Sequence, residues 1–359
     1  MNGNARKEIL YKTASRFFTA LLVLAFLGDP RGGSLAAAGR KDAAPNAAQK
    51  AAPNAAPADN SSRTAGKEAE PPVPSLYWQV VEKDGGAFVL DRAGNTVPLT
   101  PYRRIVLMSP GAVEVFYTIG AESAIAGITS GRDPIWPEEK TALLPSVGNT
   151  ARPSLEAIIA LEPDLVIGNG MTAALMADLA TRGYGVLIHN AESLADIFNS
   201  ALILGKLAGK EAEAKTLVAE KEAQLDSLKA ELKRKPLNLK GAFLYSANPI
   251  MAFTSQTLPG EILTILGVEN IAGKLNAAQP ILSAEYLLSQ NPDFLFGAMA
   301  IAKPEDILAA DSVIGKTRAG REKNIKIVPS SLIMRTSPRI VDSLLELYGE
   351  VKKYAKPGA

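Results

Sequence analysis

The sequence predicts an α/β protein with two similar lobes, mostly parallel sheets and a single long α-helix that joins the lobes. Three observations lead to this fold class. They are a long stretch of helix-forming residues, an internal repeat on its two sides, and strands that alternate with helices. Such alternation is typical of parallel sheets, because a parallel connection needs a crossover element.

The connecting helix is expected at residues 210–235. The stretch contains neither Gly nor Pro, Gly209 precedes it and Pro236 ends it. At 1.5 Å per residue the helix is roughly 35–40 Å long. Its apolar side chains recur on one helical stripe, which consists of Ala214, Leu217, Val218, Leu225, Leu228 and Leu232. A coiled coil or a solvated surface helix would show the same stripe. The flanking sequence is what distinguishes a connecting helix from these alternatives.

The flanking sequences repeat each other. Residues 154–168 read SLEAIIALEPDLVIG and residues 283–297 read SAEYLLSQNPDFLFG. Chance would give about one identity in such a window at ordinary composition. The identities in register are Ser154/Ser283, Glu156/Glu285, Pro163/Pro292, Asp164/Asp293 and Gly168/Gly297. Each copy predicts a Ser N-cap, a short helix, a Pro-Asp turn and a buried strand closed by Gly. We therefore expect one copy in each lobe.

The first lobe is expected at residues 75–209. A hairpin within 77–100 turns at 92–95. The elements expected after it are a strand at 104–109, a helix at 109–120, a strand at 124–128, the first repeat copy, a helix at 172–182, a strand at 185–189 and a helix at 193–208.

The second lobe is expected at residues 236–359. It has the second repeat copy and loops at 247–257 and 330–339. Its other expected elements are a strand at 240–246, a helix at 259–266, a strand at 324–328 and a final helix at 338–354.

Composition excludes several classes of function. The net charge of +2 over 359 residues implies no nucleic-acid partner. The chain has no Cys, which excludes disulfides, thiolate metal sites, a Cys nucleophile and a lipid-modified Cys. Its one His, His189, is too little for a bare Zn or Mn site, which usually needs several His and carboxylates. We expect no resident metal and no cofactor.

Residues 1–38 have the pattern of an export signal. Residues 17–27 form an apolar run, too short for a typical membrane span, and residues 36–38 offer an A-x-A cleavage site. An uncleaved anchor is the alternative, because residues 29–31 lengthen the segment before that site. Residues 39–74, rich in Ala, Pro, Asn and Lys, predict a disordered tether. The basic residues that precede the apolar run are Arg6, Lys7, Lys12 and Arg16.

Four segments between residues 86 and 354 carry a resemblance to a known family. They are FVLDRAGNTVPLTPYRRIVLMSP, VGN with PSLEAIIALEPDLVI, LSAEYLLSQNPDFLF and TSPRI. Together they resemble the periplasmic substrate-binding proteins of the iron-siderophore, haem and cobalamin ABC importers, the helical-backbone or class III type. The resemblance implies two Rossmann-like lobes around a metal chelate, little closure, and delivery to a dimeric permease in the inner membrane. It also implies a monomeric periplasmic protein that is not an enzyme.

The resemblance implies that one exposed Glu in each lobe meets Arg residues on the two permease subunits. The residues that match this motif are Glu156 and Glu285. A pseudo-symmetric pair of carboxylates also suits a two-fold partner on physical grounds. Either Glu alone would be explained by the helix dipole, which favours acidic residues in a first turn. The docking assignment therefore depends on the pair.

Residues in loops after strands are the expected ligand contacts by the family pattern. Arg132 and Arg335 could pair with an anionic chelate, and Trp136 could cover an apolar face. A loop-packing role explains Trp136 about as well, a surface salt bridge is the alternative for Arg335, and Arg339 is interpreted as structural. The remaining expected contacts are Ser109, Asn149, Asn169, Tyr245, Met251 and Met334.

An iron(III)-siderophore is the preferred ligand. Haem and a corrinoid are the alternatives, with His189 or Tyr245 as a haem ligand. Where cobalamin-binding relatives carry aromatic residues, this chain has Thr150, Asn169, Gln279 and Ser331, which disfavours cobalamin.

Two other classes of function stay open. One is a secreted two-lobe transferase, for which no paired catalytic signature is evident. The other is an interaction or sensor module that has lost its ligand. Residues 168–173 also fit a lone G-x-G-x-x-A motif, but the next strand ends in His189-Asn190 without the carboxylate that a ribose needs.

Overall fold

The structure is a computed structural model that describes residues 77–131, 133–275 and 280–355. The predicted export signal and tether lie outside the described residues, as do Arg132 and Gln279. Ser75–Ala359 forms one compact unit. Among the helices described, each is too short or too polar to cross a membrane.

A small antiparallel sheet opens the described chain. Its order is β1-β2-β3, with β1 at Trp78–Lys83, β2 at Gly86–Asp91 and β3 at Thr96–Pro98. The predicted turn at 92–95 joins β2 to β3, and the Asp91 carboxylate accepts hydrogen bonds from the backbone and side-chain nitrogens of Asn95 at 2.9 and 2.8 Å. The prediction missed β1, whose turn to β2 has positive φ at Asp84 and Gly85. An Asp-Gly pair between apolar runs is the sequence signal for that hairpin.

The first lobe contains a sheet of order β7-β6-β5-β4-β8-β9. Its neighbouring strands are parallel except for the β6–β7 pair. The strands are β4 (Ile105–Leu107), β5 (Ile125–Ser130), β6 (Ser146–Asn149), β7 (Arg152–Pro153), β8 (Leu165–Gly168) and β9 (Val186–Ile188). The helices are α2 (Pro110–Thr118), α3 (Glu138–Thr141), α4 (Leu155–Ala160), α5 (Ala173–Thr181) and α6 (Leu194–Leu207).

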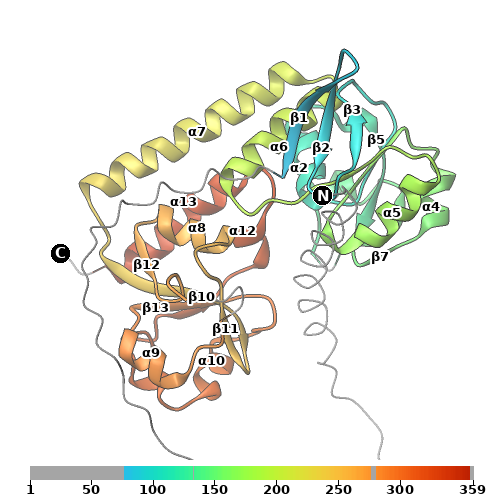
Figure 1. Cartoon of the computed structure of the whole chain (residues 1–359). Helices are drawn as coiled ribbons and strands as arrows, with labels where there is room; N and C mark the ends of the chain where they lie inside the picture. The colour runs from blue at the N-terminus through green and yellow to red at the C-terminus, as the bar shows by residue number, and fades with distance from the viewer. Residues whose placement is uncertain (1–76, 132, 276–279, 356–359) are drawn as a thin grey trace, which may run out of the picture. The chain divides into compact units, whose positions relative to one another are not determined.

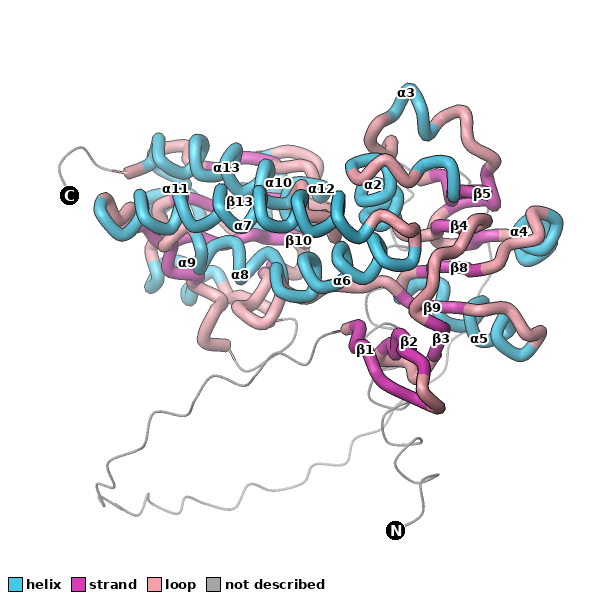
Figure 2. Tube along the Cα trace, turned by 90° about the horizontal axis from the view of Figure 1, so that it is seen from above, coloured by secondary structure: helices cyan, strands magenta, loops and turns pink. Residues whose placement is uncertain are grey.

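One long helix, α7 (Glu211–Arg234), connects this sheet to the next one (Figure 1). Its buried side chains are those of the predicted stripe, Ala214, Leu217, Val218, Leu225, Leu228 and Leu232. They pack against α6 and the C-terminal helix α13 (Ile340–Val351), and Figure 2 shows these helices side by side.

The second lobe contains the sheet β11-β10-β13-β14, and β12 pairs with the first residues of β10. Its strands are β10 (Leu239–Ala247), β11 (Ile250–Ala252), β12 (Val268–Asn270), β13 (Phe294–Gly297) and β14 (Ile325–Ile327). Its other helices are α8 (Leu258–Ile265), α9 (Ala284–Gln290), α10 (Pro304–Ala310), α11 (Arg318–Arg321) and α12 (Ser330–Met334). The strand β11 and the helix α12 lie in segments predicted as loops, so those two predictions were wrong.

The two repeat copies lie in different sheets, with β8 in the first and β13 in the second. Ser154 Oγ accepts a hydrogen bond from the backbone of Ala157 at 3.2 Å, and Ser283 Oγ accepts one from Tyr286 at 3.1 Å. Both serines are therefore N-caps, as predicted. The residue before each proline, Glu162 in one copy and Asn291 in the other, has φ of 46°. The fold class predicted from the repeat is confirmed.

The repeated aspartates tie each copy to the neighbouring strand. Asp164 accepts hydrogen bonds from the backbone nitrogens of Arg103 and Arg104 at 2.7 and 3.0 Å, just before β4. Asp293 accepts one from the backbone of Lys240 in β10 at 2.7 Å. The repeated aspartate therefore fixes the register of a parallel strand pair in each lobe, β4–β8 in the first and β10–β13 in the second.

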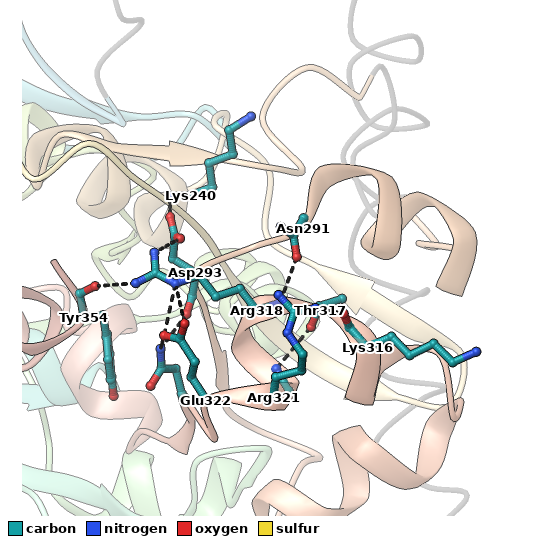
Figure 3. A network of polar contacts seen from close by, with 11 residues as sticks. Lys240, Asn291, Asp293, Lys316, Thr317, Arg318, Arg321, Glu322 and Tyr354 are labelled. Atoms are coloured by element: carbon teal, nitrogen blue, oxygen red, sulfur yellow. Dashed lines mark hydrogen bonds and ion pairs between the residues drawn. The ribbon is translucent and has the colours of Figure 1, made fainter. Parts of the chain in front are cut away.

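Asp293 also belongs to a polar network around Arg318 (Figure 3). The Arg318 guanidinium pairs with Asp293 and Glu322 and donates to the Tyr354 carbonyl at 3.3 Å. Asn291 Oδ1 accepts from the Arg318 backbone at 2.8 Å. The network joins the second Pro-Asp turn, α11 and the 3₁₀ turn at Lys352–Tyr354 that follows α13.

The lobes share one apolar core. The cluster that contains Phe116 of α2 continues through Leu217 of α7 to Ile262 of α8 and Leu344 of α13. Further clusters lie within each lobe, around Leu244 in the second and Val106 in the first. Because one apolar core is continuous between the two sheets, the two lobes form a single compact unit and are not held together by α7 alone.

Candidate ligand and docking sites

The carboxyl ends of two strands lead into segments that touch across the lobes. Strand β4 leads into α2, and β14 leads through α12 into residues 335–339. A Cβ added to Gly111 of α2 would lie 2.2 Å from Thr336 Oγ1 and 2.5 Å from the Thr336 carbonyl oxygen. Glycine is what allows this approach, because any side chain would collide. Ligands of open α/β sheets bind beside the carboxyl ends of strands, so this contact lies where a ligand is expected.

Glu114 of α2 is the polar centre of the interlobe contact. Its side chain is only 9% exposed, and Glu114 Oε2 accepts a hydrogen bond from Ser337 Oγ at 2.6 Å. Arg335 Nε lies 3.4 Å and Arg339 Nη1 3.6 Å from the same oxygen. Among the residues that the structure describes, neither of these two buried nitrogens has a hydrogen-bond partner. We call Glu114, Arg335, Ser337 and Arg339 the interlobe cluster.

Trp136 connects the interlobe cluster to the surface. The Arg339 guanidinium lies over the Trp136 ring at 4.0 Å from its centroid, a cation–π contact. Trp136 remains 40% exposed. Burial lowers the pKa of Arg339 from its ordinary value, and Glu114 acts against this shift. Trp136 is therefore both a packing partner and an exposed aromatic surface, and the structural interpretation of Arg339 stays a prediction.

Three of the expected ligand contacts are buried. Ser109 is 2% exposed, Met251 is 6% exposed and the Tyr245 ring is 7% exposed and packed on Phe253. Burial raises the pKa of Tyr245 to about 12, which disfavours the tyrosinate that haem iron would bind. This burial argues against all three as ligand contacts. The sequence and the family pattern place them at strand ends or in the loops that follow, but they do not show which way each side chain points.

His189 is a buried neutral imidazole. Ser200 Oγ donates to the Ile197 carbonyl at 3.0 Å, so it accepts from His189 Nε2 at 3.1 Å. Nδ1 then accepts from Ser109 Oγ at 2.7 Å, and the ring packs on Trp78. Both ring nitrogens are thus satisfied inside the first lobe, which argues against His189 as a haem ligand.

His189 predicts a specific loss of stability in acid. Burial lowers its pKa from 6.5 to about 4, so the unfolded chain takes up the proton first. The contribution of His189 is fully present above about pH 6.5 and is lost as the pH falls toward about 4, a total of about 3 kcal/mol. Urea unfolding of wild type and His189→Gln at pH 7, 5.5 and 4.5 measures it. The variant should lose less stability than wild type over this range, and equal losses would contradict the assignment.

Two further expected contacts, Asn149 and Asn169, lie at the surface or close to it. Asn149 is exposed, and its Oδ1 accepts from the backbone of Ala151 and Arg152 at 3.0 and 2.7 Å. Asn169 donates to the Met108 carbonyl at 2.7 Å and caps the 3₁₀ turn at Gly170–Thr172. The G-x-G-x-x-A segment is thus a tight turn closed by Asn169.

Three methionines are exposed, and two of them were not among the expected ligand contacts. Met171 is 43% exposed, Met299 42% and Met334 39%. The first two follow the repeated strands β8 and β13 by three and two residues, so they occupy nearly corresponding places in the two lobes. The register of the repeat was the signal that could have found them. Met334, which was expected, ends α12.

Two hollows in the described part of the chain lie away from the interlobe cluster. One of about 750 Å³ is formed by α6, α7 and α8, and one of about 410 Å³ lies beside Gly209. Neither is lined by an expected ligand contact. Within the part of the chain that the structure describes, no group of three or more His, Asp or Glu residues is placed to hold a metal ion.

Comparison with known proteins identifies the family. Residues 105–332 match the periplasmic binding proteins. The chain belongs to this family. A curated relative, the vitamin B12-binding protein of Vibrio campbellii, is 29% identical over 202 residues, which are 55% of this chain and 71% of the relative. The Fe(3+) dicitrate-binding periplasmic protein of Escherichia coli is 30% identical over 230 residues, which are 62% and 72%.

Solved structures agree with the fold of this periplasmic binding protein. The haem-binding protein RhuT from Roseiflexus sp. RS-1 has a TM-score of 0.63 at 22% identity, covering 71% of this chain and 100% of its own. The vitamin B12-binding protein BtuF of Vibrio cholerae has a TM-score of 0.59 at 20% identity, covering 72% and 100%. The resemblance proposed from sequence is confirmed at the level of family and fold.

The two repeated glutamates of this periplasmic binding protein are both exposed. Glu156 lies in the first turn of α4 and accepts from Ser154 Oγ at 3.0 Å, and Glu285 lies in the first turn of α9. The pKa of Glu156 is lowered by a hydrogen bond from its own backbone N–H and by Ser154. This carboxylate is therefore charged at neutral pH, as an electrostatic contact requires.

Proposed function

We propose that this periplasmic binding protein captures a metal chelate between its two lobes and delivers it to a dimeric ABC permease without chemistry. The observation that carries the proposal is the contact of α2 with residues 335–339, which brings the strand ends of both sheets together beside the exposed Trp136. Relatives named for vitamin B12 and for Fe(3+) dicitrate share one chemistry, a metal held inside an organic chelate. Binding without catalysis accords with these relatives.

The ligand that we favour is an iron(III)-siderophore. Trp136, Asn149 and Asn169 offer an aromatic face and polar groups near the strand ends, and Arg132 belongs to the same proposal from sequence. A tetrapyrrole is the second candidate, and Met171, Met299 and Met334 favour it, because exposed thioethers suit an apolar ring face.

We also propose that Glu156 and Glu285 dock on the permease. The other repeated residues have internal roles: the serines cap helices, the aspartates bind a neighbouring strand, and both prolines are buried. Gly168 has no room for a Cβ, which would lie 2.5 Å from Thr172 Oγ1. Glutamate is not needed for either helix to begin. A pair of exposed carboxylates, one in each lobe, is what a two-fold partner would use.

The periplasmic localisation of the protein is part of the same proposal. Residues 1–38 would direct export, and residues 39–74 would act as a spacer before lobes at 75–209 and 236–359 joined by the helix at 210–235. The protein would then work as a monomer in the periplasm.

A binding panel tests the proposal. Trp136 is 40% exposed and Trp78 is 1% exposed, so a ligand at the interlobe cluster should change the emission of Trp136. The protein would be titrated with a ferric hydroxamate, ferric dicitrate, haem and cobalamin, with Trp136→Phe as the control. We expect saturable binding of one chelate below about 10 μM, about 7 kcal/mol, with a fluorescence change that Trp136→Phe removes. Binding of none of them at 100 μM would contradict the proposed function.

A further inference from the structure

Glu114 is an unusual residue for its position. The segment of α2 reads PGAVEVFYT, and Glu114 is its single charged residue and is 7% exposed. A buried carboxylate is costly unless it is paired and hydrogen-bonded. The side-chain partners described above for Glu114 all belong to the second lobe: Ser337, Arg335 and Arg339. The sequence separation from Ser337 is 223 residues.

The charges in the interlobe cluster do not balance. Within the cluster two guanidinium groups face one carboxylate, and the exposed carboxylate of Asp342, which also acts on Arg339, is itself paired with Lys221. The distances of 3.4 and 3.6 Å from Glu114 Oε2 are longer than those of strong charge-assisted hydrogen bonds, which are about 2.7–2.9 Å. Arg335 Nε and Arg339 Nη1 therefore keep unused donor capacity. Glu114 holds the arginines by charge, and an oxyanion with better geometry could bind them more closely.

The arginines lie where a ligand would meet them. Arg339 stacks on Trp136, whose ring is exposed, and Arg335 follows Met334, which is also exposed. The side chain of Arg335 is itself 16% exposed. An anionic ligand at this edge would compete with Glu114 for the same two side chains, and a neutral ligand would not.

We propose that Glu114 is a specificity-determining residue that occupies Arg335 and Arg339 and so disfavours negatively charged chelates. This inference rests on the proposed function, because it concerns the choice among chelates at that site. In wild type, an anionic chelate has to displace Glu114 and leave a buried carboxylate without its partners. A chelate without negative charge leaves the interlobe cluster intact.

The test compares two ferric chelates of opposite character on the full chain. Affinities for a neutral ferric tris-hydroxamate and for anionic ferric dicitrate are measured by isothermal titration for wild type and Glu114→Gln. Glutamine keeps the shape and an acceptor for Ser337 but removes the charge. We expect Glu114→Gln to strengthen ferric dicitrate binding about tenfold relative to the hydroxamate. The double variant Glu114→Gln/Arg335→Gln should lose most of this gain.

Glu261 provides the matched control. It is a partly buried carboxylate of the second lobe whose Oε2 accepts from the backbone of Leu194 in the first lobe at 2.8 Å. Glu261→Gln also weakens a contact between lobes, but it frees no arginine. It should leave the ratio of the two affinities within about twofold of wild type.

The outcomes separate the two proposals. If the chelates bind wild type and Glu114→Gln leaves their affinity ratio unchanged, the role of Glu114 is refuted and the proposed function stands. If neither ferric chelate binds any variant, the inference fails and an iron(III)-siderophore is excluded as the ligand, whereas the proposed function fails only if haem and cobalamin do not bind either. Arg335→Gln alone supplies a second test that does not need Glu114→Gln to fold. Because Glu114 already occupies Arg335 in wild type, Arg335→Gln should change the affinity for ferric dicitrate less than twofold. A tenfold decrease in this affinity would overturn the proposal.

Discussion

Replacing Glu156 and Glu285 together with alanine should reduce chelate uptake by cells tenfold or more while chelate affinity stays within about twofold. Close charge pairs across an interface are worth about 1.5 kcal/mol or more each, and 1.4 kcal/mol is a factor of ten. Each single variant should give a partial loss, since either lobe alone keeps one pair. Uptake of the iron-labelled chelate and titration of the purified protein measure the two quantities.

The control for this pair lies in the same chain. Glu138 and Glu305 are exposed first-turn glutamates of α3 and α10, one in each lobe and both outside the repeat. Glu138→Ala/Glu305→Ala removes the same charge from similar positions and should leave uptake near wild type. Equal effects of the two double variants would show that net charge matters and not docking by the repeated pair. A loss of chelate affinity in Glu156→Ala/Glu285→Ala would move these residues to the ligand site.

The second large effect is expected at Asp293. Its side chain is 15% exposed and that of Arg318 is 16% exposed, and Asp293 also accepts from the backbone of Lys240. Asp293→Ala leaves Arg318 with Glu322 as its remaining carboxylate partner and removes the anchor at the start of β10. Breaking a buried ion pair costs about 3–5 kcal/mol, and the partial exposure with Glu322 as a second partner reduces this to roughly 2–4 kcal/mol. Urea unfolding measures the change.

The repeat supplies the comparison for Asp293. Asp164 is exposed and accepts from the backbone nitrogens of Arg103 and Arg104. Asp164→Ala should therefore cost only about 1–2 kcal/mol, the range for a lost backbone hydrogen bond. Equal costs at the two aspartates would mean that the Arg318 network contributes nothing to stability.

Much of the fold could be predicted because its signals are local. The stripe of α7, the N-cap serines and the Pro-Asp turns are all set by residues close in sequence. The repeat then placed the two sheets without any knowledge of long-range contacts. The strand β11 and helix α12 were missed because their segments, IMA and SSLIM, are short and carry no period to separate them from a loop.

The candidate site could be predicted only in part. Strand order places Trp136 and Arg335 near a strand end, but it does not reveal that Arg335 is engaged by Glu114. That pairing depends on the approach of α2 to residues 335–339, which only the folded chain creates. A lone Glu in an otherwise apolar helix was the available sequence signal, and it indicates a partner without naming one. The burial of Ser109 and Tyr245 follows from side-chain packing, which the sequence pattern does not predict.

The central claim is that one chelate contacts both lobes at the strand ends. Hydrogen exchange of the full chain, measured with and without the chelate that binds best, tests it most directly. We expect added protection at the same time in the Trp136 loop of the first lobe and in residues 331–337 of the second. Protection confined to one lobe, or to the hollow formed by α6, α7 and α8, would contradict it.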